Sequence, residues 1–405
     1  MKEILITLSI TLLFSACASF ADVNSISKIN HNANLEEIDI DQAVNMDKMV
    51  FSSYFKEPKT IVLEKKEDCI IKEITSLEIF NNRIYILDSE LNKLYVFKKD
   101  GTFEKTIGEK GRGHGEYIEI SDFSIDRSLK ILYLWDEALD MAHKYKLPTG
   151  EYISSVKTER NGARTYCMLF FNKRLYLNRS SEDASIKYHI KEIDESNGNQ
   201  TASYLSSDEY NLGWNYPLRI SNSYFYCKNS KEPKYIEMFS DTIIGFTEKG
   251  LQPAYAIKSK DFVKKQDIEH IVSKQGENNL YDMSKLYNSN KIYQISCLAE
   301  NESMLIFKYI RGDSPCFLLY DRIKNKSITS EIMSNDYIAR DNTIPMDIMY
   351  CDKKYALSVL NPIYMKYFVD YFVSKNKISP ELDNYDSIKQ LKEDSNPVLF
   401  LHEYK

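Results

Sequence analysis

Residues 76–107 read SLEIFNNRIYILDSELNKLYVFKKDGTFEKTI, and this stretch decides the fold. Its apolar residues alternate in four short runs: Ser76–Phe80, Arg83–Asp88, Leu94–Phe97 and Phe103–Ile107. Turn-forming residues separate the runs, and an Asp-Gly pair between alternating apolar runs is a strong hairpin signal. The stretch therefore predicts about four antiparallel strands that form one small sheet.

The second run of this sheet recurs along the chain. Its equivalent positions are Tyr85, Tyr133, Tyr176, Phe225, Ile306 and Tyr355, which are 48, 43, 49, 81 and 49 residues apart. The long interval contains a polar, charged stretch, residues 259–290, with helical character over Asp261–Ser273. Without these 32 residues the interval is also 49. Repeats of this length with four strands have the dimensions of a propeller blade.

A single four-stranded sheet cannot bury both of its faces, but sheets packed radially bury each other's faces and leave only short edges. The sequence therefore predicts an all-β protein, a six-bladed β-propeller with four-stranded antiparallel blades and short helical insertions. Lys59–Glu64 and Pro397–Leu401 are expected to meet in the closing blade. Short helices are expected at Tyr364–Lys375 and Ser387–Asp394. A pair of β-sandwich layers is the alternative.

Composition limits the class of partner. The chain has 405 residues, 53 Lys+Arg against 59 Asp+Glu, a net charge of −6 and 43% hydrophobic residues. The hydrophobic content excludes low-complexity disorder. The acidic balance argues against a nucleic acid partner, since nucleic acid binding needs a basic face.

The N-terminus has the pattern of a secretory signal. Lys2 precedes an apolar run from Ile4 to Phe14, which is too short to span a bilayer as a helix. The run ends in Phe14-Ser15-Ala16-Cys17, which resembles the lipobox of bacterial lipoproteins. This resemblance implies cleavage before Cys17 and lipidation of Cys17. The alternative is an ordinary signal peptide cut elsewhere, for example after Ala21.

These segments give the expected organisation of the chain. Residues 1–16 are a lipoprotein signal peptide, 17–48 a tether, and 49–405 the propeller with its insert at 259–290. Several acyl chains give firm anchoring without a transmembrane helix. The predicted partner is thus a membrane, reached through the lipid anchor, and the predicted location is the cell envelope, with the outer membrane favoured.

Six cysteines follow Cys17. None belongs to a CxxC pair, and none has a histidine at metal-ligand spacing. We interpret them as buried free thiols because most lie in apolar runs, although an exported chain can oxidise its thiols. These cysteines are Cys69, Cys167, Cys227, Cys297, Cys316 and Cys351.

Several segments resemble a known family. Residues 94–108 resemble a blade of NHL-like propellers. Gly108–Tyr117 resembles the G-x-x-G-x-G-P-G-E-Y loop of a large family of six-bladed β-propeller lipoproteins from Gram-negative gut anaerobes. Phe239–Ile243 and Asn396–Leu399 are similar to a D-T-I-Y segment and to the C-terminus of that family. His114 stands where the family has Pro, and Ile244 where Tyr is commoner. The resemblance implies the fold and the location, but no catalytic residue.

Two sets of residues are candidate ligand-binding groups. By analogy with other propellers, the loop Gly108–Tyr117 is expected over the mouth of the channel, with Arg112, His114, Glu116 and Tyr117 as candidates. Asp88 and Asp136 end their second strands on the same face. The alternative is structural: glycines shape the turn, and Asp at a strand end bonds its own turn backbone.

No cofactor and no metal is predicted. Carboxylates at strand ends can bind cations, but the corresponding residues of units three and four are Asn178 and Lys228, so no acidic ring forms.

The sequence favours a binding or interaction module for a glycan, a small ligand or an envelope protein. The alternative is a propeller hydrolase or lyase acting on glycans or lactones, with Arg112, Glu116, Asp88 and Asp136 as the first residues to suspect. A third possibility is a structural lipoprotein whose insert docks a partner.

Overall fold

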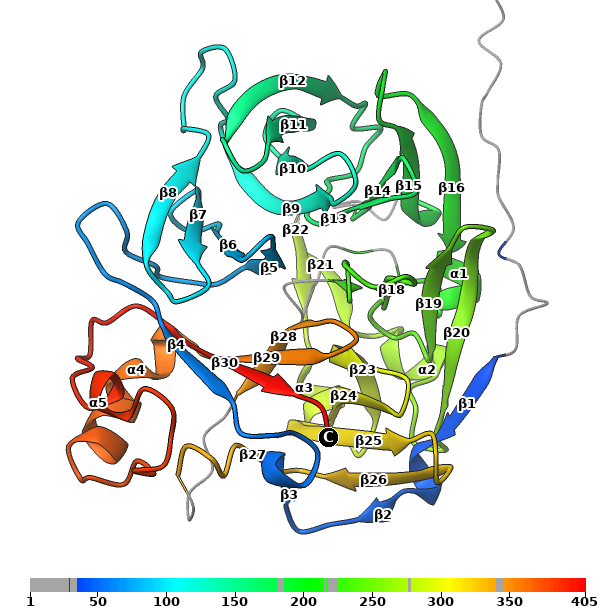
Figure 1. The fold of residues 1–405 in the computed structure, drawn as a ribbon. Helices are drawn as coiled ribbons and strands as arrows, with labels where there is room; N and C mark the ends of the chain where they lie inside the picture. Colours follow the sequence, from blue (N-terminus) through cyan, green and yellow to red (C-terminus); the bar gives the residue numbers. More distant parts are fainter. Residues whose placement is uncertain are drawn as a thin grey trace, which may run out of the picture.

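The computed structural model describes residues 29, 35–180, 186–214, 216, 224–275, 278–339 and 346–405. Within these residues six sheets, each with four antiparallel strands, stand around a common axis, so the predicted six-bladed β-propeller is confirmed (Figure 1). The first strands of successive blades contact one another, as β9 and β13, β23 and β28, and β28 and β5 do. These strands are therefore the innermost strands of the ring.

The blades follow one another in chain order. Blade 1 is β5 (Ser76–Phe80), β6 (Arg83–Asp88), β7 (Lys93–Lys98) and β8 (Phe103–Ile107). Blade 2 is β9 (Ile120–Asp126), β10 (Ile131–Asp136), β11 (Met141–Lys146) and β12 (Glu151–Lys157). Blade 3 is β13 (Met168–Phe171), β14 (Arg174–Asn178), β15 (Tyr188–Asp194) and β16 (Gln200–Ser206), and helix α1 (Ser207–Tyr210) follows it.

The second half of the ring is less regular. Blade 4 is β17 (Phe225–Tyr226), β18 (Lys234–Tyr235), β19 (Thr242–Thr247) and β20 (Gly250–Lys258). Blade 5 is β23 (Ile292–Glu300), β24 (Met304–Arg311), β25 (Ser314–Asp321) and β26 (Lys326–Ser330). Blade 6 is β28 (Asp347–Cys351), β29 (Tyr355–Leu360), β30 (Val398–Glu403) and β4 (Lys59–Val62).

The turns have the residues that their geometry demands. Asn81 and Asn82, between β5 and β6, have φ of 47° and 58°. Asn172 and Lys173 form the matching turn of blade 3, with φ of 48° and 60°. Two successive residues with positive φ match a type I′ hairpin turn, which suits the twist of the flanking strands. Asparagine tolerates this conformation better than most residues.

The core lies between neighbouring blades. Apolar residues from blades 1 and 2 form one buried cluster, which includes Leu87, Val96, Phe123 and Leu134. Each of these side chains is fully shielded from solvent. A blade that stood alone would expose this surface, so packing between blades stabilises the ring at roughly 25 cal/mol per Å² of apolar area buried.

The ends of the chain close the ring, as predicted. β4 pairs antiparallel with β30, and Val62 lies opposite Val398. The segment before β4 adds three further strands to the rim: β1 (Glu36–Asp39), β2 (Val44–Asn45) and β3 (Met49–Val50). We call residues 36–50 the N-terminal belt. It runs along the outside of blades 4 and 5, in blue in Figure 1.

The belt corrects the expected boundary of the tether. β1 pairs in parallel with β20, and β2 in parallel with β26. Residues 36–45 therefore belong to the folded body, although they were expected in a tether over 17–48. The acidic composition of Glu36–Asp39 suits an exposed edge strand. Cys17 and the signal segment lie outside the described residues.

Two further corrections concern insertions and blade 4. The insert at 259–290 contains helices α2 (Lys265–Ile268) and α3 (Ser284–Tyr287), but between them lies a hairpin of β21 (Val272–Gln275) and β22 (Asn278–Tyr281). Phe225 belongs to the innermost strand of blade 4, not to the second as expected. The second strand, β18, has only two residues, so the aromatic run that contains β17 has the clearer strand pattern in the sequence.

Short helical segments occur in blade 6, as predicted. They lie between β29 and β30 and comprise η3 (Pro362–Tyr364), α4 (Met365–Phe368), η4 (Val369–Val373) and α5 (Tyr385–Ile388). Phe368, Phe372 and Ile388 anchor them in a buried cluster with Val398 and Phe400. Among the described residues no helix is both long and apolar enough to cross a membrane.

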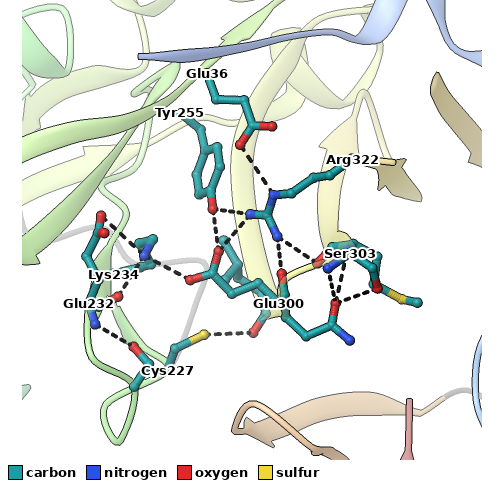
Figure 2. A network of polar contacts seen from close by, with 12 residues as sticks. Glu36, Cys227, Glu232, Lys234, Tyr255, Glu300, Ser303 and Arg322 are labelled. Atoms are coloured by element: carbon teal, nitrogen blue, oxygen red, sulfur yellow. Dashed lines mark hydrogen bonds and ion pairs between the residues drawn. The ribbon is translucent and has the colours of Figure 1, made fainter. Parts of the chain in front are cut away.

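A buried network of charges joins the belt to blades 4 and 5 (Figure 2). Lys234 Nζ lies 2.8 Å from Glu300 Oε1, and Arg322 Nη2 lies 3.2 Å from Glu300 Oε2. Tyr255 donates a hydrogen bond to the same carboxylate. Arg322 Nε also lies 3.4 Å from Glu36 of β1. Glu300 is thus the centre of the network, and it connects three separate parts of the chain.

Candidate ligand cavity at the ring axis

The ring encloses a cavity of about 470 Å³. The innermost strands β5, β17, β23 and β28 contribute Glu78, Phe225, Gln294, Ser296 and Tyr350 to its wall. A cavity built by the innermost strands of four blades lies at the axis of the ring. Its size falls within the usual range for small-molecule sites, about 300–1,000 Å³.

Two charged residues of the cavity wall, Lys228 and Glu78, form ion pairs with residues that do not line the cavity. Lys228 Nζ, just after β17, lies 2.6 Å from Asp122 Oδ2 of β9. Arg127 Nη2 lies 2.9 Å from Glu78 Oε2 of β5. Burial raises the pKa of Glu78, although Arg127 and Lys228 oppose this shift. Within each pair the two charges neutralise one another. The third charged residue of the cavity lining is Lys308, which also interacts with a neighbouring group.

Neutral polar groups complete the wall. Asn229 Nδ2 donates to the Tyr350 hydroxyl at 2.7 Å, and that hydroxyl donates to Asp352 Oδ2 at 3.1 Å. Gln294 is 2% exposed and lines the cavity. Its Nε2 donates to the Ile295 carbonyl, but its Oε1 is buried with no hydrogen-bond partner among the described residues. A buried acceptor without a partner costs free energy, and a ligand hydroxyl or amide would satisfy it.

The helical insertion of blade 6 contributes an apolar lip. Ile363 and Tyr364, in η3, line the cavity and are 78% and 42% exposed. Side chains that both line the cavity and face solvent lie at its opening. Exposed apolar side chains at the edge of a cavity are typical of binding sites.

The candidates Asp88 and Asp136 have fully buried side chains. Each carboxylate accepts hydrogen bonds from the backbone of the segment that leads into its own blade. Asp88 Oδ2 accepts hydrogen bonds from the backbone N–H groups of Lys72 and Glu73, at 2.7 and 3.2 Å. Asp136 Oδ2 accepts one from the N–H of Ile118 at 2.6 Å. Burial alone would raise the pKa of Asp136, but His143 and the backbone N–H groups of Ile118, Leu139 and Glu119 lower it below its ordinary value.

Blade 3 has the same cap with a different residue. Asn178 Oδ1 accepts hydrogen bonds from the backbone N–H groups of Tyr166 and Cys167, at 2.9 and 2.7 Å. The cap thus needs an oxygen acceptor but no charge. This explains why Asn178 stands at the end of its second strand where blades 1 and 2 have Asp.

The loop Gly108–Tyr117 lies over the outer part of blade 2. The Tyr145 hydroxyl of β11 donates to the Gly115 carbonyl at 3.0 Å, and the rings of His114 and Tyr152 of β12 are 4.9 Å apart. Tyr117 is buried and its hydroxyl donates to the Asn92 carbonyl at 2.8 Å. The expectation that this loop covers the channel mouth is therefore wrong.

The glycines of the loop enclose the carboxylate of Glu116. The Gly113 N–H donates to Glu116 Oε2 at 2.6 Å, and a Cβ on Gly111 would lie 1.9 Å from that oxygen. Arg112 and His114 are exposed. None of the six candidate residues lines the axial cavity. A ligand for this loop stays a prediction.

The cavity residues Glu78 and Lys228, and Asp122 that pairs with Lys228, were missed because they come from three blades. A signal existed for one of them: Glu78 is a charged residue inside an innermost strand, between the apolar residues Leu77 and Ile79. Among the described residues no group of three or more His, Cys, Asp or Glu side chains is arranged to hold a metal ion.

The fold and the cavity define a six-bladed β-propeller with an axial site. The chain belongs to the family described as a domain of unknown function, DUF4934, whose model matches residues 35–403. No curated protein matches the chain.

Solved structures from Bacteroides share the architecture. A Bacteroides fragilis NCTC 9343 protein, named "putative exported protein", aligns with a TM-score of 0.69 and 17% identity over 92% of this chain and 99% of its own. A DUF4221 family member from Bacteroides vulgatus ATCC 8482 aligns with a TM-score of 0.50 and 9% identity over 87% and 97%. The fold that the sequence resemblance implied is confirmed.

Proposed function

We propose that this protein is a cell-envelope binding module whose axial cavity holds one small, uncharged ligand. The cavity itself carries the proposal: it is built by innermost strands, it has an apolar lip, and two of its charged residues, Glu78 and Lys228, are paired. The suitable ligand has an apolar face for the aromatic wall and hydroxyl or amide groups for Gln294 and Asn229. A sugar has these properties, because its apolar face stacks on aromatic rings.

The experiment is an isothermal titration calorimetry measurement in which neutral mono- and oligosaccharides are titrated into the chain from Ala18 to Lys405. Ile363→Ala should weaken the binding of any ligand found by about 3- to 10-fold, because apolar area at the lip is lost. Ile323→Ala is the matched control, since Ile323 is 81% exposed and does not line the cavity. Equal affinities for the two variants would place the ligand elsewhere and contradict the proposal.

The envelope location and lipid anchor belong to the same proposal. The lipobox-like segment that ends at Cys17 supports them, and so does the name of the Bacteroides fragilis relative. Cys17→Ser should move the protein from the membrane fraction to the soluble fraction and abolish incorporation of a labelled fatty acid. A membrane-bound C17S protein without a label would show that another segment anchors the chain.

One observation favours the enzyme alternative. Glu78 lines the cavity, and burial raises the pKa of its carboxyl group, as general acids require. However, Glu78 is tied to Arg127, so binding is the better-supported function. Turnover of a glycan or lactone that disappears in Glu78→Gln would reverse this order.

A further inference from the structure

Two cysteines meet in the wall of the axial cavity. The Sγ atoms of Cys227 and Cys351 are 2.9 Å apart, and each lies 3.9 Å from the carbonyl oxygen of Leu298. Figure 2 shows Cys227 at the edge of the charge network, with its sulfur directed at a backbone carbonyl. Even carbon atoms in contact stand about 3.5–4.0 Å apart, so the two sulfur atoms are closer than ordinary packing brings them.

This pair differs from the other cysteines whose side chains are described. Cys69 contacts the Glu64 carbonyl and Asn396, and Cys316 lies against the Ser314 carbonyl. A metal site does not explain the pair, because the described residues offer no third ligand among His, Cys, Asp and Glu. Each thiol thus has the other as its closest sulfur partner.

We infer that Cys227 and Cys351 are a disulfide-forming pair that staples blade 4 to blade 6 across the innermost strand of blade 5. The oxidant is a small or protein disulfide of the glutathione class. Its S–S bond breaks as the Cys227–Cys351 bond forms, two electrons pass to it, and the two thiol protons end on its released thiols. The sulfur atoms need to approach by less than about 1 Å to reach bonding distance.

The local backbone favours this closure. Cys227 has φ of 51°, a conformation that residues other than glycine rarely adopt. The N–H of Ser230 donates to the Cys227 carbonyl at 2.8 Å, which holds the turn after β17. The turn therefore presents the thiol to Cys351 in the reduced protein. The resulting staple would enclose residues 227–351, which include all of blade 5.

The staple goes beyond the proposed binding function. Its occurrence in the cell rests on the proposed envelope location, since disulfides persist in oxidising compartments, but the pairing itself can be tested in solution. The neighbouring thiol and burial both raise the pKa of Cys227. The folded protein should therefore react slowly, and oxidation is best examined during refolding.

The experiment refolds the full chain in reduced and oxidised glutathione, denatures it, alkylates the free thiols and maps the peptides by mass spectrometry. The expected result is one linked pair of peptides that contain Cys227 and Cys351, with Cys69, Cys167 and Cys316 alkylated. Reduction should lower the thermal midpoint by about 5–10 °C, because the loop that the staple closes is long.

Two variants separate the staple from general effects of oxidation. Cys351→Ser should remove the difference in thermal midpoint between oxidised and reduced protein, whereas Cys316→Ser, also buried, should retain it. If a variant does not fold, the peptide map of the unchanged chain still decides. Alkylation of both Cys227 and Cys351 after oxidative refolding, or a link from either to another cysteine, would overturn the inference.

Discussion

Replacing Glu300 by glutamine is expected to lower the free energy of unfolding by about 3–5 kcal/mol. Glu300 lies between Lys234 and Arg322, and the Lys234 side chain is only 3% exposed. Burial alone would raise the pKa of Glu300, but Lys234, Tyr255 and Arg322 lower it below its ordinary value. The carboxylate is therefore charged in the fold, and without it the buried ammonium group of Lys234 keeps only Glu232 as a counter-charge, at 3.5 Å and with a side chain that is 38% exposed (Figure 2).

The matched control is Glu302→Gln, two residues away. The Glu302 side chain is 93% exposed and lies 3.7 Å from exposed Lys353, and such surface pairs contribute at most about 1 kcal/mol. The measurement is urea unfolding monitored by tryptophan fluorescence. The slope of the transition must be the same in both variants for their midpoints to report stability. Equal midpoints for E300Q and E302Q would contradict the structural role of the network.

Acid is expected to destabilise the ring through His402. This residue lies in β30 of the closing blade, is fully buried, and contacts the rings of Phe51 and Phe55 at 4.9 and 5.5 Å. Its Nε2 lies 3.1 Å from Ser358 Oγ and 3.3 Å from Asn335 Nδ2. Burial lowers the pKa of His402 from 6.5 to about 3.

The direction of the pH effect follows from proton binding. Between pH 6.5 and 3 the unfolded chain binds a proton at His402 and the folded chain does not. Acid therefore favours unfolding, and stability falls by about 1.4 kcal/mol per pH unit in this window, or about 5 kcal/mol across it. Above pH 7.5 His402 is neutral in both states and should add no pH dependence.

His402→Leu tests this assignment. The difference in unfolding free energy between the variant and the unchanged chain should be constant from pH 7.5 to 9 and should shift in favour of the variant as the pH falls below about 6. Chemical denaturation at several pH values measures both curves. Parallel curves over the whole range would show that another group causes the loss of stability in acid.

The repeat was readable from the sequence because each blade satisfies its own local rules. Asn81-Asn82 and Asp100-Gly101 have the turn chemistry that hairpins need, and the runs between them alternate as half-buried strands do. The pairing of β4 with β30 could also be predicted, since an unclosed ring would leave apolar edges exposed. These features are local or follow from closure.

The belt and the cavity could not be read in this way. Glu36–Asp39 is a short acidic segment whose pairing with β20 is parallel and distant in sequence, and no hairpin signal marks such contacts. The cavity depends on which residues of separate blades face the axis, as Glu78 and Lys228 do. Spacing within a blade fixes the alternation of a strand, but the orientation of one blade against another depends on packing.

The closing pairing constrains the order of folding. Lys59–Val62 and Val398–Glu403 come from opposite ends of the chain, so their contact has a very large sequence separation. The chain loses the conformational entropy of closing this loop before the contact stabilises the fold. During synthesis blade 6 stays incomplete until Val398–Glu403 has left the ribosome. A nascent chain of this protein is thus an open arc with two unpaired edges until β30 has been synthesised.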